Sequence, residues 1–117
     1  MVRREPYVTL DGSVVEEILR PEDGARRMSL ALARIDEGRR TQPHRHRTSD
    51  EIYYVLQGEG VVYLGSQPHR VCPGEAVYIP AGTEHWAVVV SGPMEILCVC
   101  SPPYQHEDTD LSGGVAV

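Results

Sequence analysis

The chain has 117 residues, a length that suits one domain with its own core but not two independent domains. Its formal net charge of −6 would repel a phosphate backbone, so we expect no nucleic-acid partner. No apolar run is long enough to cross a bilayer, and the basic start MVRREPYVTLDG lacks the apolar region of a secretory signal. The sequence therefore predicts a single domain, 1–117, located in the cytoplasm and not in a membrane.

Short strands dominate the expected secondary structure. The chain has no phenylalanine, and its β-branched residues and tyrosines suit a pleated sheet, with 11 glycines and 9 prolines to make turns. About eight short strands at regular spacing predict an all-β fold, either a closed barrel or a double-sheet jelly roll. The clearest apolar runs place strands, in chain order, at 13–19, 26–35, 51–57, 61–64, 76–79, 86–90 and 95–100.

The segments between these strands carry turn chemistry. QGEG predicts a tight hairpin, SGPM a second strand connection, and RPEDG and PAGTEH two further turns. The stretch GSQPHRVCPGE is expected to be a connection without a strand. The polar tail, 101–117, begins with two prolines, which forbid a central strand there.

The cysteines do not form a zinc-finger pattern. Cys72, Cys98 and Cys100 are an odd number, and the last two alternate within an apolar run, which is typical of free buried thiols. A soft-metal site at the CxC pair is the weaker alternative. Residues two apart share a strand face, so some members of two rows should line a barrel cavity. These rows are Ile96, Cys98 and Cys100, and Met28, Leu30 and Leu32.

Two histidines lie close together in PHRHRTSDE. On extended chain His44 and His46 point to one face, whereas Arg45 points to the other. Glu51 begins the next predicted strand, and His85 stands at the start of a later one, where both can face the same interior space. A histidine near a turn is more often an ordinary hydrogen-bonded residue than a metal ligand, so the HxH pair alone does not establish a site.

The wider spacing is more specific than the histidine pair. In two parts, its members are Gly38, His44, His46, Glu51 and Gly58, and then Gly74, Pro80, Gly82 and His85. This pattern closely resembles the cupin superfamily over a motif core of 38–90. The resemblance implies a double-stranded β-helix, a jelly-roll-like barrel, with one divalent metal ion held by His44, His46, Glu51 and His85. Cupins often carry asparagine where this chain has Val89, so the pocket wall is expected to be more apolar.

The implied donor set leaves the metal undetermined. Iron, manganese, nickel, zinc, cobalt and copper all accept imidazole and carboxylate ligands. Three neutral imidazoles and one carboxylate leave a divalent ion with a net charge of about +1 and with open coordination positions. That charge favours a small, carboxylate-bearing ligand. Arg39 and Arg40 either help to attract it or belong to a solvated loop.

The expected function is that of a metal-dependent enzyme acting on a small polar or anionic metabolite. Dioxygenase chemistry ranks slightly ahead of metal-assisted isomerase or lyase chemistry on a sugar-related compound. An open metal site suits all three reactions, and nothing in the sequence excludes any of them. The alternative from another class is a non-catalytic module that binds a metal and a small ligand. Tyr53 and Tyr63 are candidate catalytic proton donors, although inward tyrosines often only fill a core.

Two further features concern the surface. His106 either caps the barrel mouth or is an ordinary surface histidine. Apolar residues occur on both faces of the predicted strands, and a small barrel can hide only one face inside. The sequence therefore predicts a homodimer, which is the commonest closed assembly.

Overall fold

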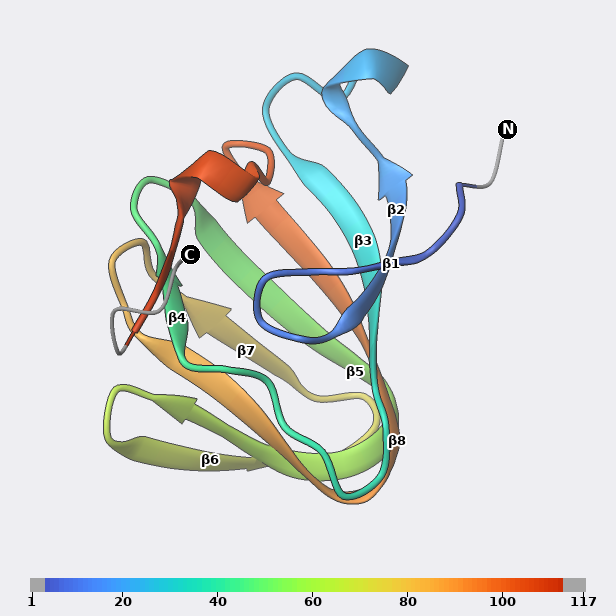
Figure 1. The fold of residues 1–117 in the computed structure, drawn as a ribbon, viewed down its shortest axis with the longest axis vertical. Coiled ribbons are helices and arrows are strands. Elements are labelled where there is room, and N and C mark those ends of the chain that lie inside the picture. The colour runs from blue at the N-terminus through green and yellow to red at the C-terminus, as the bar shows by residue number, and fades with distance from the viewer. Residues whose placement is uncertain (1–3, 113–117) are drawn as a thin grey trace.

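The computed structural model describes residues 4–112, in which regular structure is almost entirely strand. The strands form one antiparallel sheet that curls round on itself (Figure 1). In chain order the elements are β1 (Tyr7–Val8), β2 (Val14–Leu19), the 3-10 helix η1 (Pro21–Asp23), β3 (Ser29–Ile35), β4 (His44–His46), β5 (Asp50–Leu64), β6 (Gln67–Val71), β7 (Ala76–Ile79), β8 (His85–Ser101), the 3-10 helix η2 (His106–Asp108) and β9 (Thr109–Leu111).

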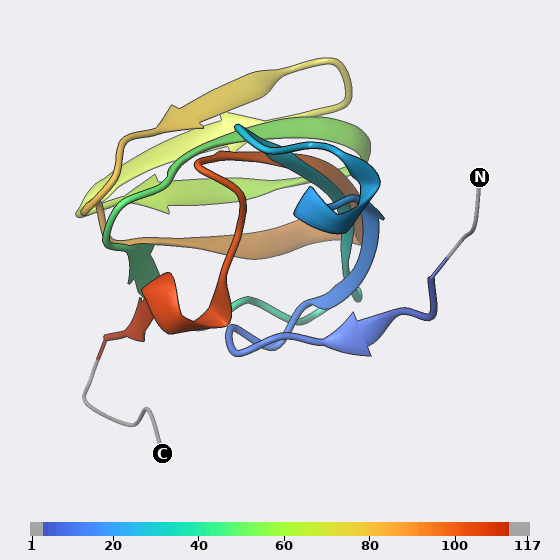
Figure 2. The same cartoon turned by 90° about the horizontal axis from the view of Figure 1, so that it is seen from above.

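The central elements of the sheet are β5 and β8, which pair with each other along most of their length. From β8 the sheet continues through β3 and β2 to β1 on one path and through β4 to β9 on another, while β5 also pairs with β6 and β7. Seen from above, the N-terminal strands close one side of the fold, and β5, β6 and β7 form the opposite side (Figure 2). The all-β, jelly-roll-like barrel predicted from the sequence is confirmed.

The connections predicted at QGEG and SGPM are wrong, because neither segment ends a strand. β5 runs through 15 residues and β8 through 17, and the two segments lie opposite each other where both strands bend. The pairing is irregular between Val55 and Gly60, so this part of β5 carries bulges rather than a reversal of direction. Glycine-rich turn chemistry suits a bulge as well as a hairpin, and the sequence could not distinguish them.

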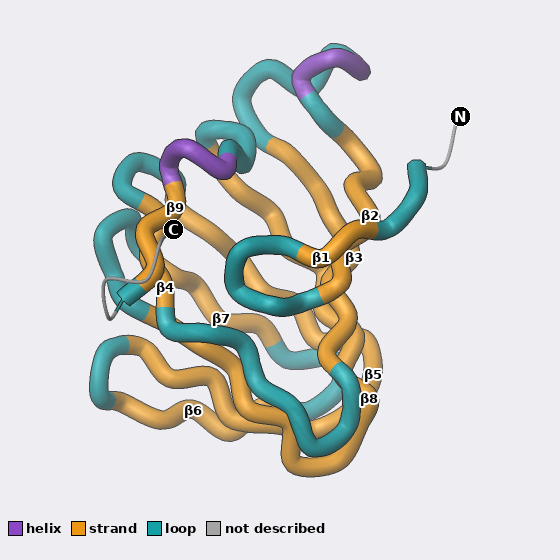
Figure 3. The backbone as a smooth tube through the Cα atoms, viewed as in Figure 1, coloured by secondary structure: helices purple, strands orange, loops and turns teal. Residues whose placement is uncertain are grey.

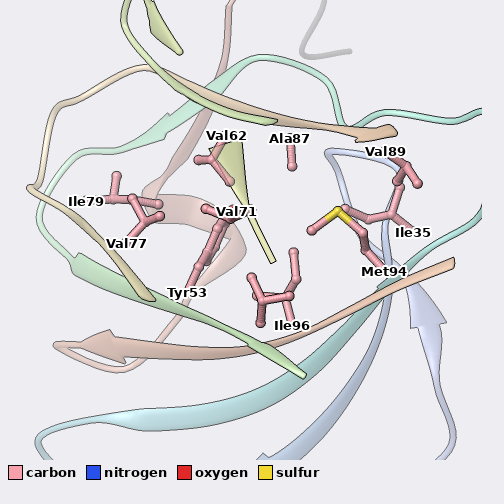
Figure 4. Packing of buried hydrophobic residues seen from close by; sticks show 11 residues of the cluster. Ile35, Tyr53, Val62, Val71, Val77, Ile79, Ala87, Val89, Met94 and Ile96 are labelled. Atoms are coloured by element: carbon pink, nitrogen blue, oxygen red, sulfur yellow. The ribbon is translucent and has the colours of Figure 1, made fainter. Parts of the chain in front are cut away.

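Alternation along the strands separates the inside from the outside, as the period of two predicts. On β5, Glu51, Tyr53 and Val55 are buried, whereas Ile52 and Tyr54 are exposed. The inward residues build a single core, shown in Figure 4. Its buried members are Ile35, Tyr53, Val55, Val62, Val71, Val77, Ile79, Ala87, Val89, Met94 and Ile96.

The structure differs from the sequence prediction at β3 and at β6. β3 starts at Ser29, and Met28 is exposed, so the inward residues of this strand are Ala33 and Ile35 rather than the row that Met28 begins. β6 lies inside the stretch expected to be a plain connection. Its exposed proline, histidine and arginine give no strand signal, and among residues 4–112 it pairs with β5 alone. In the tail, β9 pairs at the edge of the sheet with β4, which agrees with the absence of a central strand there. Residues 113–117 of the predicted tail lie outside the described residues.

Candidate metal centre

The four predicted ligand residues meet inside the fold. His44 and His46 lie on β4, and Glu51 and His85 lie at the starts of β5 and β8. His44 stands directly opposite His85 in the pairing of β4 with β8. All four side chains are buried, and one donor atom from each lies within 4.8 Å of the others. The strand register therefore assembles a cluster that could hold one metal ion.

Each of the three imidazole rings is oriented through its Nδ1 atom. Two of the partners are carbonyls, and the third is the hydroxyl of Thr109, which donates its own proton to the Gln105 carbonyl. An N–H at Nδ1 therefore donates to each of the three oxygens, and the Nε2 lone pair is left to face the cluster. The contacts are from His44 to the Gln42 carbonyl at 2.8 Å, from His85 to the Thr83 carbonyl at 2.9 Å, and from His46 to the Thr109 hydroxyl at 3.0 Å.

The arrangement of the Nε2 atoms fits a bound cation. Glu51 Oε1 lies 3.0 Å from His46 Nε2 and 3.4 Å from His85 Nε2. An imidazole lone pair and a carboxylate oxygen repel each other at such distances unless a proton or a metal ion lies between them. Within residues 4–112, His85 Nε2 is buried and has no hydrogen-bond partner. A metal ion bonded to this atom would remove the free-energy penalty of an unsatisfied polar group.

Two pKa shifts favour the forms that bind metal. Burial alone would raise the pKa of Glu51, but the hydrogen bond with His46 and the nearby His85 lower it well below the ordinary carboxyl value. Burial lowers the pKa of His44, and the neighbouring His85 adds to this effect. An ionised carboxylate and neutral imidazoles are the metal-binding states. The pKa of His46 is raised, because the Glu51 carboxylate outweighs burial, so a proton competes with metal for this ring.

A cavity of about 60 Å³ opens beside the cluster and reaches His44, His46 and Glu51. Its wall is mostly apolar, and the row of Ile96, Cys98 and Cys100 belongs to it, as the sequence predicted. Of the row that begins at Met28 only Leu30 lines the cavity, and the opposite row of β3 lines it as well. The carboxylates at the wall are those of Asp11, Glu17 and Glu51, and no arginine or lysine of the described chain lines the cavity. One water needs about 10–15 Å³ of such space, so the cavity can take a ligand equal in size to about four to six waters. Because the cavity is open on one side, a longer ligand can extend from it into solvent.

The structure separates the two candidate tyrosines. Tyr53 is buried, lines the cavity and has its ring centre 5.9 Å from that of His85. Burial and the Glu51 carboxylate raise its pKa far above the ordinary value, so its phenol stays protonated. Tyr63 is only half-buried, stacks on Trp86 at 4.8 Å and does not line the cavity. Its position offers no contact with a ligand at the cluster.

The remaining residues singled out in the sequence lie around this site or away from it. Arg39 and Arg40 are exposed, lie outside the cavity lining and belong to the loop 36–43, which runs from β3 to β4 in Figure 3. His106 is exposed, and its Nδ1 lies 2.8 Å from the hydroxyl of Tyr104, a residue of the cavity wall.

Cys98 and Cys100 are free thiols that are partly and fully buried, as the sequence predicted, whereas Cys72 is free but exposed. Burial, followed by the Glu51 charge, raises the pKa of Cys98 and of Cys100. Neither residue belongs to the cluster of candidate metal ligands in the described part of the chain.

Sequence reasoning missed the parts of the chain that support the cluster from outside the motif core. Thr109 orients His46, and the Tyr104 ring lies edge-on to His46 at 5.7 Å. Asp11, in the loop between β1 and β2, has Oδ2 at 3.6 Å from His44 Nε2. Both segments are short polar stretches, TLDGS and HEDTD, that resemble ordinary turns in a linear sequence.

Asp108 in the tail holds the loop that joins His46 to Glu51. Its carboxylate accepts hydrogen bonds from the N–H and hydroxyl of Thr48, each at 2.9 Å, and from the Ser49 N–H at 3.2 Å. These hydrogen bonds outweigh burial and lower the pKa of Asp108. The tail therefore positions the metal-binding loop through an ionised side chain.

Replacing Asp108 by Asn is expected to lower the free energy of unfolding at pH 7 by about 1–3 kcal/mol, the usual range for hydrogen bonds to a charged group. A lowered pKa in the folded state stabilises the fold above the unfolded value of about 3.9 and loses that effect as the pH falls through the folded value. The deficit of the variant should therefore shrink below pH 4 in urea titrations. Asp110→Asn, which removes an exposed pair with Arg47, is the control and should cost less than about 1 kcal/mol. A deficit that is independent of pH would contradict this role.

Comparisons with known proteins agree with this architecture. A protein of Methanocaldococcus jannaschii that is described as uncharacterised is 42% identical over 110 residues, which cover 92% of this chain and 87% of that protein. Dimethylsulfoniopropionate lyase DddW of Ruegeria pomeroyi is 40% identical over 67 residues, but these cover 57% of this chain and 43% of the lyase. The solved structure of KdgF from Halomonas sp. superposes with a TM-score of 0.77 at 24% identity, covering 89% of this chain and 91% of that one.

The helices among residues 4–112 are 3-10 turns of three residues each, and none of them could span a membrane.

The sequence pattern that describes the cupin domain matches residues 31–100, a range that contains all four residues of the cluster. The chain is therefore a member of the cupin family.

Proposed function

We propose that this protein is a metal-dependent enzyme that acts on a small polar metabolite bound beside one divalent transition metal ion. The observation that supports this is the convergence of His44, His46, Glu51 and His85, the first three of which line a cavity, with each imidazole oriented through Nδ1. A divalent ion held by these donors would supply Lewis-acid polarisation of a ligand oxygen. Iron, manganese, nickel, zinc, cobalt and copper are all compatible with the donor set.

The residues around the site favour redox-neutral chemistry, such as isomerisation or elimination, over dioxygenation. Tyr53 keeps its proton because of burial, so it can donate a hydrogen bond to a ligand oxygen in the cavity. The wall around Tyr53 is mostly apolar. Dioxygenase chemistry, which ranked first on the sequence alone, is the second candidate, because an apolar wall also suits dioxygen.

Metal-loaded protein should convert at least one member of a panel of hydroxylated metabolites and α-hydroxy or α-keto carboxylates, with products detected by NMR. We expect the turnover to continue under strict anaerobiosis and to be lost in Glu51→Gln, because a neutral amide is a weaker metal ligand than a carboxylate. Glu59→Gln, an exposed change on the same strand, is the matched control and should keep full activity. Turnover that requires dioxygen and consumes it would establish dioxygenase chemistry instead. Binding without any product would favour the non-catalytic module.

We expect the protein to form a homodimer through the outer face of β5 and β7. Ile52, Tyr54, Leu56 and Tyr78 are all more than one third exposed on this face, with Tyr78 at 55%. Light scattering at high micromolar concentration should give a dimer for the wild type and a monomer for Tyr54→Glu. Val8→Glu, which changes an exposed residue of β1, should remain dimeric. A monomeric wild type would contradict this assembly.

A further inference from the structure

Asp11 is held beside the candidate metal centre by its own loop. Its Oδ1 atom accepts three hydrogen bonds, from the Thr9 hydroxyl at 2.6 Å, the Ser13 hydroxyl at 2.7 Å and the Ser13 N–H at 2.9 Å. The Asp11 carbonyl accepts a hydrogen bond from the Gln42 N–H at 2.8 Å, which ties the loop to the segment leading into β4. Figure 3 shows this loop between β1 and β2 reaching toward β4. The carboxylate is therefore positioned independently of the four clustered residues.

The second oxygen of Asp11 is free to bind a ligand. Oδ2 lies 3.6 Å from His44 Nε2, and no group in the described part of the chain donates a hydrogen bond to it. Asp11 is not among the residues whose donor atoms all lie within 4.8 Å of one another. Two ligands on opposite sides of an ion, with bonds of about 2.1 Å, are only about 4.2 Å apart. Asp11 Oδ2 thus lies beside the coordination shell rather than within it.

Asp11 also changes the charge that an incoming ligand meets. Together the carboxylates of Glu51 and Asp11 offset both charges of a divalent ion, and Glu17 adds another carboxylate to the cavity wall. Among residues 4–112 the wall contains no basic side chain other than histidine. A ligand carboxylate would therefore be repelled by acidic groups without gaining an arginine partner. A neutral ligand can approach an ion through one oxygen and donate a hydrogen bond from the neighbouring hydroxyl.

Resting on the function proposed above, we propose that Asp11 determines the ligand class: its Oδ2 accepts a hydrogen bond from a ligand hydroxyl, and the site takes neutral polyhydroxylated molecules of the polyol or carbohydrate class in preference to carboxylates. This preference is the opposite of the one predicted from the residual charge of the four clustered residues alone. The distinguishing side chain is contributed by the β1–β2 loop, outside the motif core.

The test compares two probes that share a carbon skeleton, the neutral polyol ribitol and the carboxylate D-ribonate. Binding to metal-loaded protein is measured by calorimetry, and metal content is measured by elemental analysis of the same samples. Wild-type protein should bind ribitol more tightly than ribonate. Asp11→Asn should keep its metal, weaken ribitol binding roughly tenfold or more and strengthen ribonate binding, because the charged acceptor is replaced by a neutral one. Asp36→Asn removes an exposed carboxylate of the β3–β4 loop and should change neither affinity.

The outcomes separate this inference from the proposed function. Wild-type protein that holds no metal overturns the proposed function, whatever the probes do. Metal-loaded wild type that does not bind ribitol, or that prefers ribonate, overturns the role of Asp11. Loss of metal in Asp11→Asn would make Asp11 a ligand and would also overturn it. Equal shifts for the two probes in Asp11→Asn would show a general effect on the cavity rather than selection by charge.

Discussion

Replacing His46 by Ala is expected to lower metal affinity by at least about 100-fold. Changes to groups that merely orient a ligand typically cost about 10–100-fold, and loss of the ligand itself should cost at least as much. His46 is buried, lies 3.0 Å from Glu51 and is oriented by Thr109, so no nearby histidine can replace it without moving a strand. Elemental analysis of protein purified without added metal should find about one ion per wild-type chain and little in the variant.

The thermal stability of the two proteins provides a second readout. An ion that binds only the folded state stabilises it by about 2.7 kcal/mol when its free concentration is 100 times the dissociation constant. Added metal should therefore raise the melting temperature of the wild type but not that of His46→Ala. His69→Ala, an exposed change on β6, is the control and should respond like the wild type. Equal metal content in wild type and His46→Ala would show that the cluster is not a metal site.

Replacing Gly58 by Ala is expected to destabilise the fold by more than about 3 kcal/mol or to prevent folding. Gly58 lies at the bend of β5 with a φ of +81°, a left-handed conformation that costs an L residue about 1–2 kcal/mol. A Cβ atom there would also lie 2.4 Å from the Pro93 carbonyl oxygen and 2.9 Å from the Met94 Cα. Both contacts are with backbone, so β5 and β8 would have to separate where they bend together.

Gly74→Ala is the matched control for this prediction. Gly74 has a similar φ of +91°, but a Cβ at that position meets nothing within 4 Å. Its substitution should cost only the backbone strain of about 1–2 kcal/mol. The difference between the two variants in urea denaturation measures the close approach of the strands. If both substitutions cost the same, the steric role of Gly58 is wrong.

The strand faces were predictable because alternation is a local property of extended chain. Glu51 and Tyr53 were expected to face inward, and both are buried. The bend of β5 and β8 was not predictable in this way. Glycine and proline disrupt regular pairing at a bulge as they do at a hairpin, and only the partner strand decides whether the chain turns back. QGEG and SGPM bend together because they face each other across the β5–β8 pair.

The supporting residues around the cluster depend on contacts between distant parts of the chain. Thr109 and Asp11 reach the histidines only because β9 pairs with β4 and because the β1–β2 loop bonds to Gln42. Neither contact leaves a periodic signal in the sequence, since a single hydrogen bond requires only one suitable side chain in the right place. The carboxylates that Asp11 and Glu17 add to the mostly apolar cavity wall were not predictable for the same reason.

The sequence by itself determined the strand-rich class, the inward row at the start of β5 and, through the resemblance to the cupins, the residues that form the cluster. Those features depend on side-chain alternation and on the fixed spacing of histidines, glutamate and glycines, which are readable along one chain. Only the tertiary structure decided that β5 and β8 are continuous, that Tyr53 rather than Tyr63 reaches the cavity, and that Asp11 stands beside His44. These features arise from the register of paired strands and from loop contacts between distant residues, and the curling of one sheet into a barrel brings those residues together.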